Sequence, residues 1–253
     1  MAIRGGLWVE EGGSGTPALL LLHGLGGNAA VWSNLLPIIE QRWRGRWLAP
    51  DLPGHGRSPH TPPYSIGRHA AAVAALLEPG AKIVVLGHSM GGAVAMALAS
   101  GWFGVEVAHV IAFGVKLVWQ EEEIAKARAL AQSPARRFAM RAEAVERHLR
   151  VAGLAGLVDP DSATAQSGVV AEGGEFRLAA DPRISEVVGA PIDQIVAAMR
   201  APLRLAAGAR DAMVSLEQMR RFDPAAVLIE DAGHNPHVEA PERLWRFVED
   251  ALS

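Results

Sequence analysis

Short apolar runs alternate with helical patterns along much of this chain. The first three runs each end near glycine or proline, and they are Ala18–Leu22, Trp47–Ala49 and Lys82–Leu86. Later runs are Val107–Phe113, Leu203–Ala207 and Val227–Ile229, and helical patterns cover about residues 29–40, 65–77, 93–100 and 241–252. Strands that are apolar throughout and alternate with helices are typical of a parallel sheet covered on both faces. The pattern therefore predicts an α/β protein.

The alternation breaks between about Val118 and Met199. Helical patterns cover Glu121 to Leu130 and Pro134 to Val151, whereas residues 153–191 look loop-like and show no convincing pair of strands. An insertion of this size between two strands is usually functional. We therefore expect a core domain made of residues 1–117 and 200–253, with residues 118–199 forming a helical cap or lid.

The bulk composition narrows the class of protein further. The chain has 253 residues and a net charge of −3, which argues against a general nucleic-acid binder. It contains no cysteine, so disulfides, thiolate metal sites and a cysteine nucleophile are excluded. No apolar run reaches the ~20 residues of a membrane span, and the start lacks a signal-peptide core. We expect a cytoplasmic protein that acts on a small molecule, and the oligomeric state stays open.

A nucleophile motif follows the third apolar run. The pattern G-x-S-x-G is weak alone, but here it lies between a buried strand and an alanine-rich helix, as the motif requires. A tight turn there would present the serine hydroxyl at a helix N-terminus, where negative charge is favoured. A serine that only caps a helix needs no glycine on either side. The motif reads Gly87-His88-Ser89-Met90-Gly91, and Ser89 is the candidate nucleophile.

A serine nucleophile needs a base, which in this strand–turn–helix class follows it in the sequence. The candidates are His109, His148, His234 and His237. We expect His109 to be buried in the sheet and His148 to lie on a solvated helix face. His234 follows the last strand at the carboxyl edge of the sheet, so it is the predicted base. His237 shares the loop and is the second candidate.

The base needs a carboxylate that orients it and stabilises its charged form. Asp211 closely follows the strand Leu203–Ala207 and lies at the same edge of the sheet. Asp231 is too close in sequence to His234 and is expected to hold its turn. Asp181 and Asp193 belong to the cap or its return. Asp211 is therefore the predicted third member of the triad.

Acyl transfer also needs donors for the developing oxyanion. The backbone N–H of Met90, directly after the nucleophile, is one candidate, and the N–H of Leu25 in the glycine-rich loop after the first run is the other. This loop lacks the Gly-Lys-Ser/Thr of a phosphate-binding loop. Gly24, His88 and Trp119 are further expected to contact the substrate. We expect no metal site and no organic cofactor.

Five segments together resemble the α/β-hydrolase superfamily, in its order and over nearly the whole chain. They are Leu21–Gly26, Asp51–Ser58, Gly87–Gly92, Ala207–Asp211 and Gly233–Glu242. More narrowly, the chain resembles capped bacterial carboxylesterases, lactonases and carbon–carbon bond hydrolases. The resemblance implies an α/β-hydrolase fold: a mostly parallel sheet with helices on both faces and a helical lid inserted late in the sheet. It also implies a structural role for the turn Asp51–Ser58. Similar dehalogenases and epoxide hydrolases carry an aspartate nucleophile, so Ser89 speaks against those reactions.

Charged residues gather in the first half of the cap. The arginines are Arg136, Arg137, Arg141, Arg147 and Arg150. They predict a solvated helix face with ion pairs, since charge runs are usually solvated. The sharper alternative is an arginine that receives an anionic group of the substrate. Trp119 either lines the pocket or anchors the cap, and Trp32 and Trp102 are expected to pack around the sheet.

These features predict a serine hydrolase that cleaves an ester-type bond of a small carboxylic ester through an acyl-enzyme. One alternative is hydrolysis of a carbon–carbon bond in a dienone-type product of aromatic degradation, which uses the same triad. Acyl transfer to an acceptor other than water is a variant. The other alternative is a ligand-binding or signalling protein on the same fold, because a fold alone does not prove a function.

Overall fold

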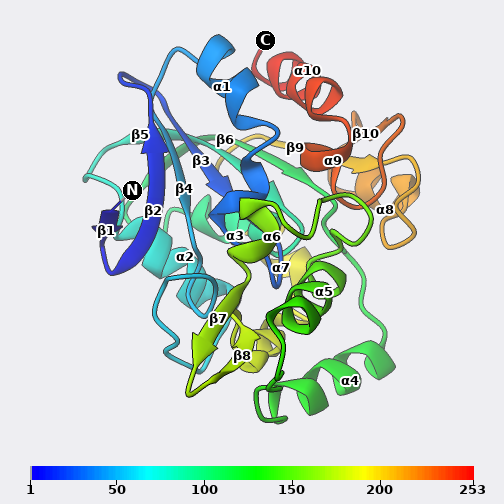
Figure 1. The fold of residues 1–253 in the computed structure, drawn as a ribbon. Helices are drawn as coiled ribbons and strands as arrows, with labels where there is room; N and C mark the ends of the chain where they lie inside the picture. Colours follow the sequence, from blue (N-terminus) through cyan, green and yellow to red (C-terminus); the bar gives the residue numbers. More distant parts are fainter. Residues whose placement is uncertain (1) are drawn as a thin grey trace.

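The computed structural model describes residues 2–253, and its centre is an eight-stranded sheet (Figure 1). The strand order is β1-β2-β4-β3-β5-β6-β9-β10. The strands are β1 (Ala2–Arg4), β2 (Leu7–Gly12), β3 (Ala18–Leu22), β4 (Trp47–Pro50), β5 (Lys82–His88), β6 (Glu106–Phe113), β9 (Leu203–Gly208) and β10 (Val227–Ile229). β1 and β2 form antiparallel pairs, whereas all pairs from β4 to β10 are parallel. The predicted α/β-hydrolase fold with a mostly parallel sheet is confirmed.

The six predicted strands are all present, but β1 and β2 were not predicted. Glycines in the first fifteen residues obscured them, although Leu7 and Val9 are buried and alternate with the half-exposed Trp8 and Glu10. This period of two is the signal of a strand with one face in the core. The first two strands therefore extend the parallel sheet with an antiparallel edge.

Helices cover both faces of the sheet. One face packs against α2 (Ile66–Ala74), α3 (Met90–Leu98) and α7 (Ile192–Ala197), and the other against α1 (Leu36–Arg42) and α10 (Pro241–Leu252). Two shorter helices, α8 (Leu216–Arg220) and α9 (Pro236–Glu239), lie near the end of the chain. The central strands are consequently buried on both sides, which explains their unbroken apolar runs.

The first predicted helix is divided into two pieces. Residues 29–32 form a 3₁₀ helix. Asn28 caps its N-terminus, because the Asn28 side chain accepts a hydrogen bond from the Ala30 N–H at 3.0 Å. α1 starts only at Leu36. Pro37 lies in its first turn, which is the part of a helix where proline is best tolerated. A continuous helix over residues 29–40 was therefore wrong, although both pieces lie within or beside that range.

The segment between β6 and β9 contributes no strand to the central sheet. It contains α4 (Glu121–Ala131), α5 (Arg141–Val151), α6 (Ala163–Gln166), the strands β7 (Val169–Glu172) and β8 (Glu175–Leu178), and a 3₁₀ helix Pro182–Val187. In Figure 1, α4, α5 and the β7–β8 hairpin lie at the opposite end of the molecule from α1 and α10. We call residues 118–199 the cap segment. Its last helix, α7, packs on α3 and belongs to the core.

Two expectations for the cap segment were wrong. β7 and β8 form an antiparallel hairpin with Gly173 and Gly174 at its turn, both at positive φ. A Gly-Gly pair between two short runs is a known hairpin signal. The helix expected from Pro134 starts only at Arg141, because Phe138 instead bridges to Phe176 of the hairpin.

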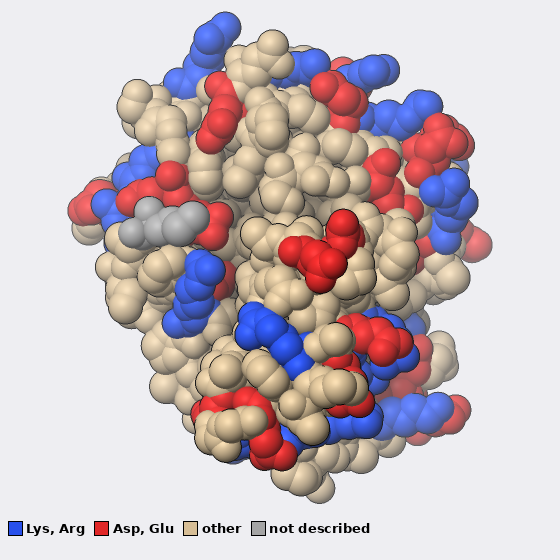
Figure 2. Space-filling model, in the orientation of Figure 1, with Lys and Arg blue, Asp and Glu red and all other residues tan. Residues whose placement is uncertain are grey.

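The surface carries mixed charge. Figure 2 shows acidic and basic side chains side by side over the cap end of the visible face, with no field of one sign. Within residues 2–253, no helix has the length and apolar character needed to cross a lipid bilayer.

Candidate active site

Ser89 lies in a strained turn between β5 and α3. Its backbone has φ 50° and ψ −117°, a combination that costs free energy for a residue with a side chain. Glycine is required on both sides. A Cβ on Gly87 would lie 2.6 Å from the carbonyl oxygen of Gly91, and one on Gly91 would lie 2.1 Å from that of Leu22. The predicted strand–turn–helix context of the motif is therefore present.

His234 and Asp211 meet at the same edge of the sheet. The His234 Nδ1–H donates a hydrogen bond to Asp211 Oδ2 at 2.8 Å, and the Asp211 carboxylate is only 1% exposed. Asp211 follows β9 and its other oxygen accepts the Met213 N–H at 2.9 Å, which fixes the carboxylate. A proton on Nδ1 leaves Nε2 of His234 as the free acceptor of the ring.

One cavity of about 390 Å³ brings together the predicted residues other than Asp211, and we call it the active-site cavity. Its lining includes Ser89, His234, Gly24, Leu25, Met90, His88 and Trp119. Within residues 2–253, no hydrogen bond joins the Ser89 hydroxyl to the His234 ring. Such bonds in ligand-free enzymes commonly tighten only when substrate binds. The remaining wall is mostly apolar.

The two expected oxyanion donors lie beside the nucleophile. Met90 is the first residue of α3, so its N–H is one of the helix N-terminal donors without an intrahelical acceptor. Leu25 lies in a turn closed by a 3.1 Å hydrogen bond from the Gly27 N–H to the Gly24 carbonyl oxygen. A Cβ on Gly24 would lie 3.2 Å from the Ser89 Cβ, so glycine lets this loop approach the nucleophile.

Two further histidines pack beneath the cavity. The His88 Nε2–H donates to the His234 carbonyl oxygen at 2.9 Å, and its ring stacks on Phe113. His237 is fully buried between His88 and Trp32. Burial lowers the pKa of His88 well below its usual range and that of His237 to about 3. Both rings are therefore neutral near pH 7, and the hydrogen bond to Asp211 favours His234 over His237 as the base.

Three expectations for single side chains were wrong. His148 is 2% exposed, because it packs against Gly168, where a Cβ would lie 2.1 Å from the imidazole ring. Trp102 is 72% exposed, whereas Trp32 is buried as expected. His109 is only half-buried in β6. The helical pattern around His148 hid its burial because charged residues flank it in sequence.

The other acidic candidates have local roles. Asp231 takes positive φ at the turn before His234, and its carboxylate accepts a hydrogen bond from Arg243 at 2.8 Å. Asp181 accepts the Tyr64 hydroxyl at 2.9 Å, while Asp193 is an exposed residue in the first turn of α7. None of the three contacts His234 through a hydrogen bond.

The turn after β4 is held by Asp51. Its carboxylate accepts the Ala29 N–H at 2.7 Å and the Arg57 N–H at 2.8 Å. His23 accepts the Leu52 N–H at 2.9 Å through Nε2. These bonds tie the turn to the loop that carries Leu25.

Asn235 was not predicted as a site residue. Its side chain is buried and donates a 2.9 Å hydrogen bond to the Gly153 carbonyl oxygen, which joins the His234 loop to the end of α5. The only sequence signal for Asn235 was its position directly after the predicted base. Its contact with Gly153 could not be predicted, because the two residues are 82 positions apart in the sequence.

Most of the cap arginines have a partner within the protein. Arg137 pairs with Glu172, Arg150 pairs with Glu146, and Arg141 donates to Gln166. These contacts favour the interpretation of a solvated, ion-paired surface. Arg150 also lines the active-site cavity, whereas Arg136 and Arg147 line a smaller neighbouring one.

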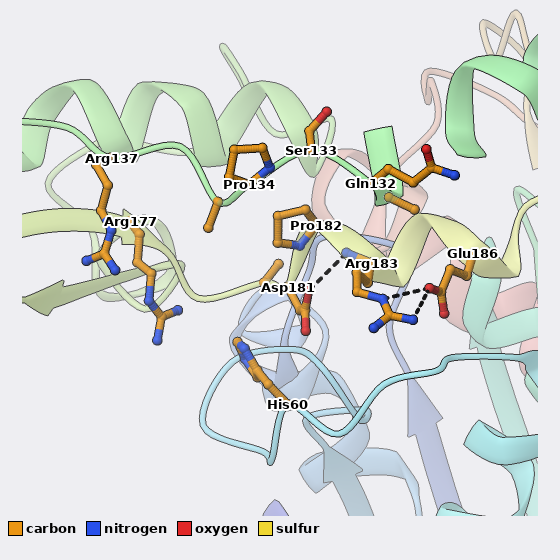
Figure 3. A pocket seen from close by; sticks show the side chains of 13 residues that line it. His60, Gln132, Ser133, Pro134, Arg137, Arg177, Asp181, Pro182, Arg183 and Glu186 are labelled. Atoms are coloured by element: carbon orange, nitrogen blue, oxygen red, sulfur yellow. Dashed lines mark hydrogen bonds and ion pairs between the residues drawn. The ribbon is translucent and has the colours of Figure 1, made fainter. Parts of the chain in front are cut away.

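A larger hollow of about 760 Å³ lies on the cap surface (Figure 3). Figure 3 shows Arg183 bonded to Glu186, with Arg137 and Arg177 on the opposite side of the hollow. Neither Ser89 nor His234 lines it, and it is more open than the active-site cavity. We call it the cap groove and do not assign the chemistry to it.

The family model described as the alpha/beta hydrolase family matches residues 19–247. The match covers most of the chain, so the chain belongs to the alpha/beta hydrolase family. The predicted superfamily membership is thereby confirmed.

Curated relatives match a shorter part of this chain than the family model does. The chain is 44% identical over 94 residues to lipase LipV of Mycobacterium tuberculosis, covering 35% of this chain and 34% of that protein. It is 44% identical over 93 residues to a pimeloyl-(acyl-carrier protein) methyl ester esterase of Aeromonas hydrophila, covering 36% and 35%. The match thus spans about a third of the length of these curated relatives.

Solved structures match over the whole fold. An E-2-(acetamidomethylene)succinate hydrolase superimposes with a TM-score of 0.78 at 24% identity, covering 97% of this chain and 94% of that one. A thioesterase domain from the curacin biosynthetic pathway gives 0.75 at 22% identity, covering 95% and 94%. At these identities the likeness shows the shared fold.

Proposed function

We propose that this chain is a serine hydrolase that cleaves the ester bond of a small carboxylic ester. The observation that carries the proposal is the 2.8 Å hydrogen bond between His234 and the buried Asp211, in a cavity that also receives Ser89 from a strained turn. Two curated relatives are named as a lipase and a methyl ester esterase, which supports an ester bond over a carbon–carbon bond as the one that is cleaved.

The proposed reaction starts at the Ser89 hydroxyl. His234 Nε2 takes its proton while the oxygen attacks the ester carbonyl, and Asp211 stabilises the imidazolium that forms. The N–H groups of Leu25 and Met90 bind the oxyanion. His234 then protonates the departing alcohol, which leaves an acyl group on Ser89. A water molecule deprotonated by His234 releases the acid and regenerates the serine.

We also propose that residues 118–199, apart from the core helix α7, act as a cap that shapes the substrate cavity. Trp119, at the start of this segment, lines the cavity together with Gly24 and His88. Lys116 lies over the Trp119 ring and pairs with Glu123, so the tryptophan has a fixed position. We place this activity in the cytoplasm, whose reducing conditions fit a sequence without cysteine.

Initial rates on p-nitrophenyl esters of increasing acyl length test the proposal. Ser89→Ala should lower kcat/KM by about a thousandfold or more, since triad members act as a unit. Ser14→Ala, which removes an exposed hydroxyl far along the chain from the motif, is the matched control and should keep full activity. Folded Ser89→Ala protein that retains most of the wild-type rate would contradict the mechanism.

A further inference from the structure

A second, smaller cavity lies next to the active-site cavity. Its volume is about 140 Å³, and we call it the distal cavity. Leu25 and Val151 line both cavities, so these two side chains form the wall between them. Beyond the wall the lining is largely apolar, with Leu130, Leu178, Ile184, Ala135 and Ala180.

One side of the Val151 side chain packs against the loop of Leu25. It is the last residue of α5, and a Cβ on Gly26 would lie 2.7 Å from Val151 Cγ1. Two residues further on, Gly153 accepts the hydrogen bond from Asn235. The end of α5 therefore packs on the loop of Leu25 and is bonded to the loop of His234, which fixes Val151 relative to both.

The distal cavity leads away from the nucleophile. It shares Ser133, Pro134, Ala135, Ala180, Asp181 and Pro182 with the cap groove of Figure 3. The three hollows thus follow one another: the active-site cavity, the distal cavity and the cap groove. An unbranched apolar chain that started at Ser89 and passed Val151 would enter an apolar space before it reached the polar groove.

We propose that Val151 is the side chain that limits acyl length, and that the distal cavity is an apolar subsite for methylene groups beyond that limit. This inference rests on the proposed ester hydrolysis. Val151 is 38% exposed, so its truncation removes a barrier without opening the buried core. Leu25 cannot be tested in the same way because its backbone is placed in the oxyanion hole.

The test is the profile of kcat/KM against acyl length for Val151→Ala and wild type, on straight-chain p-nitrophenyl esters. Each further methylene that becomes buried should raise kcat/KM by roughly fourfold. The variant should therefore prefer acyl chains that are longer by at least two carbons, with a ratio of long-chain to short-chain kcat/KM raised roughly fifteenfold. Val151→Phe should shift the profile in the opposite direction.

Two controls make the result specific. Leu157→Ala removes a similarly exposed side chain of the cap segment that is not among the lining residues, and its profile should match wild type. Adding Leu130→Trp to Val151→Ala fills the distal cavity, which should abolish the gain on long chains and preserve the rates on short ones.

Unchanged profiles in both Val151 variants, with turnover that still depends on Ser89, would overturn the inference and leave the proposed function standing. A gain in Val151→Ala that survives Leu130→Trp would overturn the assignment of the distal cavity. Absence of Ser89-dependent turnover in the wild type would instead contradict the proposed function.

Discussion

Two regions face each other across the active-site cavity, and different contacts hold them. The strand-end loops that carry Ser89, Asp211 and His234, here called the sheet edge, are fixed by buried hydrogen bonds and by glycines in backbone contact. The cap segment consists of short elements whose inner side chains, such as Leu154 and Ala165, pack into the core, while its outer face carries exposed ion pairs such as Arg137–Glu172. In the proposed mechanism, the reactive residues lie where backbone contacts leave little freedom, and substrate selection is assigned to the cap side chains that line the cavity.

The largest expected effect comes from filling a backbone contact at the sheet edge. Gly91→Ala would place a Cβ 2.1 Å from the Leu22 carbonyl oxygen, which the core cannot relieve. We expect a loss of about 4 kcal/mol or more in the free energy of unfolding, at the upper end of single substitutions. Urea unfolding measures it.

Gly67→Ala in α2 is the matched control for this substitution. A Cβ there meets no atom within 4 Å, so alanine should stabilise by roughly 0.5 kcal/mol through lower backbone entropy of the unfolded chain. Equal stability of the two variants would show that the sheet edge is not closely packed.

The next effect concerns catalysis at the same edge. Asp211→Asn keeps the shape of the side chain but cannot stabilise a charged His234, so kcat should fall by about a thousandfold or more. Asp193→Asn, at an exposed carboxylate in the first turn of α7, should leave kcat unchanged. Steady-state kinetics of the folded variants measures kcat. A decrease of less than tenfold in Asp211→Asn would contradict the role of Asp211 in stabilising the charged His234.

An intermediate effect tests the buried histidine of the cap segment, His148, which is 2% exposed. Burial lowers the pKa of His148 to about 4 from an ordinary value of 6.5. Between these values the unfolded chain binds more protons at His148 than the folded chain does. The stability gained by burying the neutral imidazole is therefore fully present above pH 6.5 and is lost as pH falls towards 4. It amounts to about 1.4 kcal/mol per pH unit.

Urea unfolding at pH 6.5 and pH 5 measures this contribution in wild type and in His148→Gln. The variant should lose less stability on acidification, by about 2 kcal/mol over this range. An identical pH dependence in the two proteins would mean that His148 is solvated after all.

The smallest effect is expected on the cap surface. Arg137→Gln removes the ion pair with Glu172, whose two side chains are nearly half exposed, and such pairs are screened by solvent and salt. We expect no measurable change in the urea midpoint or in kcat/KM. A clear loss of either would show that cap ion pairs position the substrate cavity, which would remove the distinction between the two regions.

The sequence was most informative where one strong local rule operated. The apolar runs of β3, β5 and β6 are buried on both faces, so their composition alone indicates strands. The turn around Ser89 is similarly specified by its flanking glycines. The strand-end position of His234 and Asp211 followed from chain order, and the structure joins them by a hydrogen bond.

Other features depended on contacts between distant segments. The hairpin β7–β8 had a readable Gly-Gly signal, but the pairing of Phe138 with Phe176 could not be inferred locally. The burial of His148 depends on Gly168, and the wall made by Val151 depends on Gly26 and Leu25. A periodic pattern reports which face of a helix is apolar, but not which partner covers it.

The central claim is that Ser89 forms the covalent intermediate. The most direct measurement is peptide mass spectrometry after treatment with a fluorophosphonate, which reacts covalently with activated serines, on wild type and on His234→Ala. The account predicts one label per wild-type chain, located on Ser89, and little or no label when His234 is absent. A label on another residue, or equal labelling of Ser89 without His234, would contradict it.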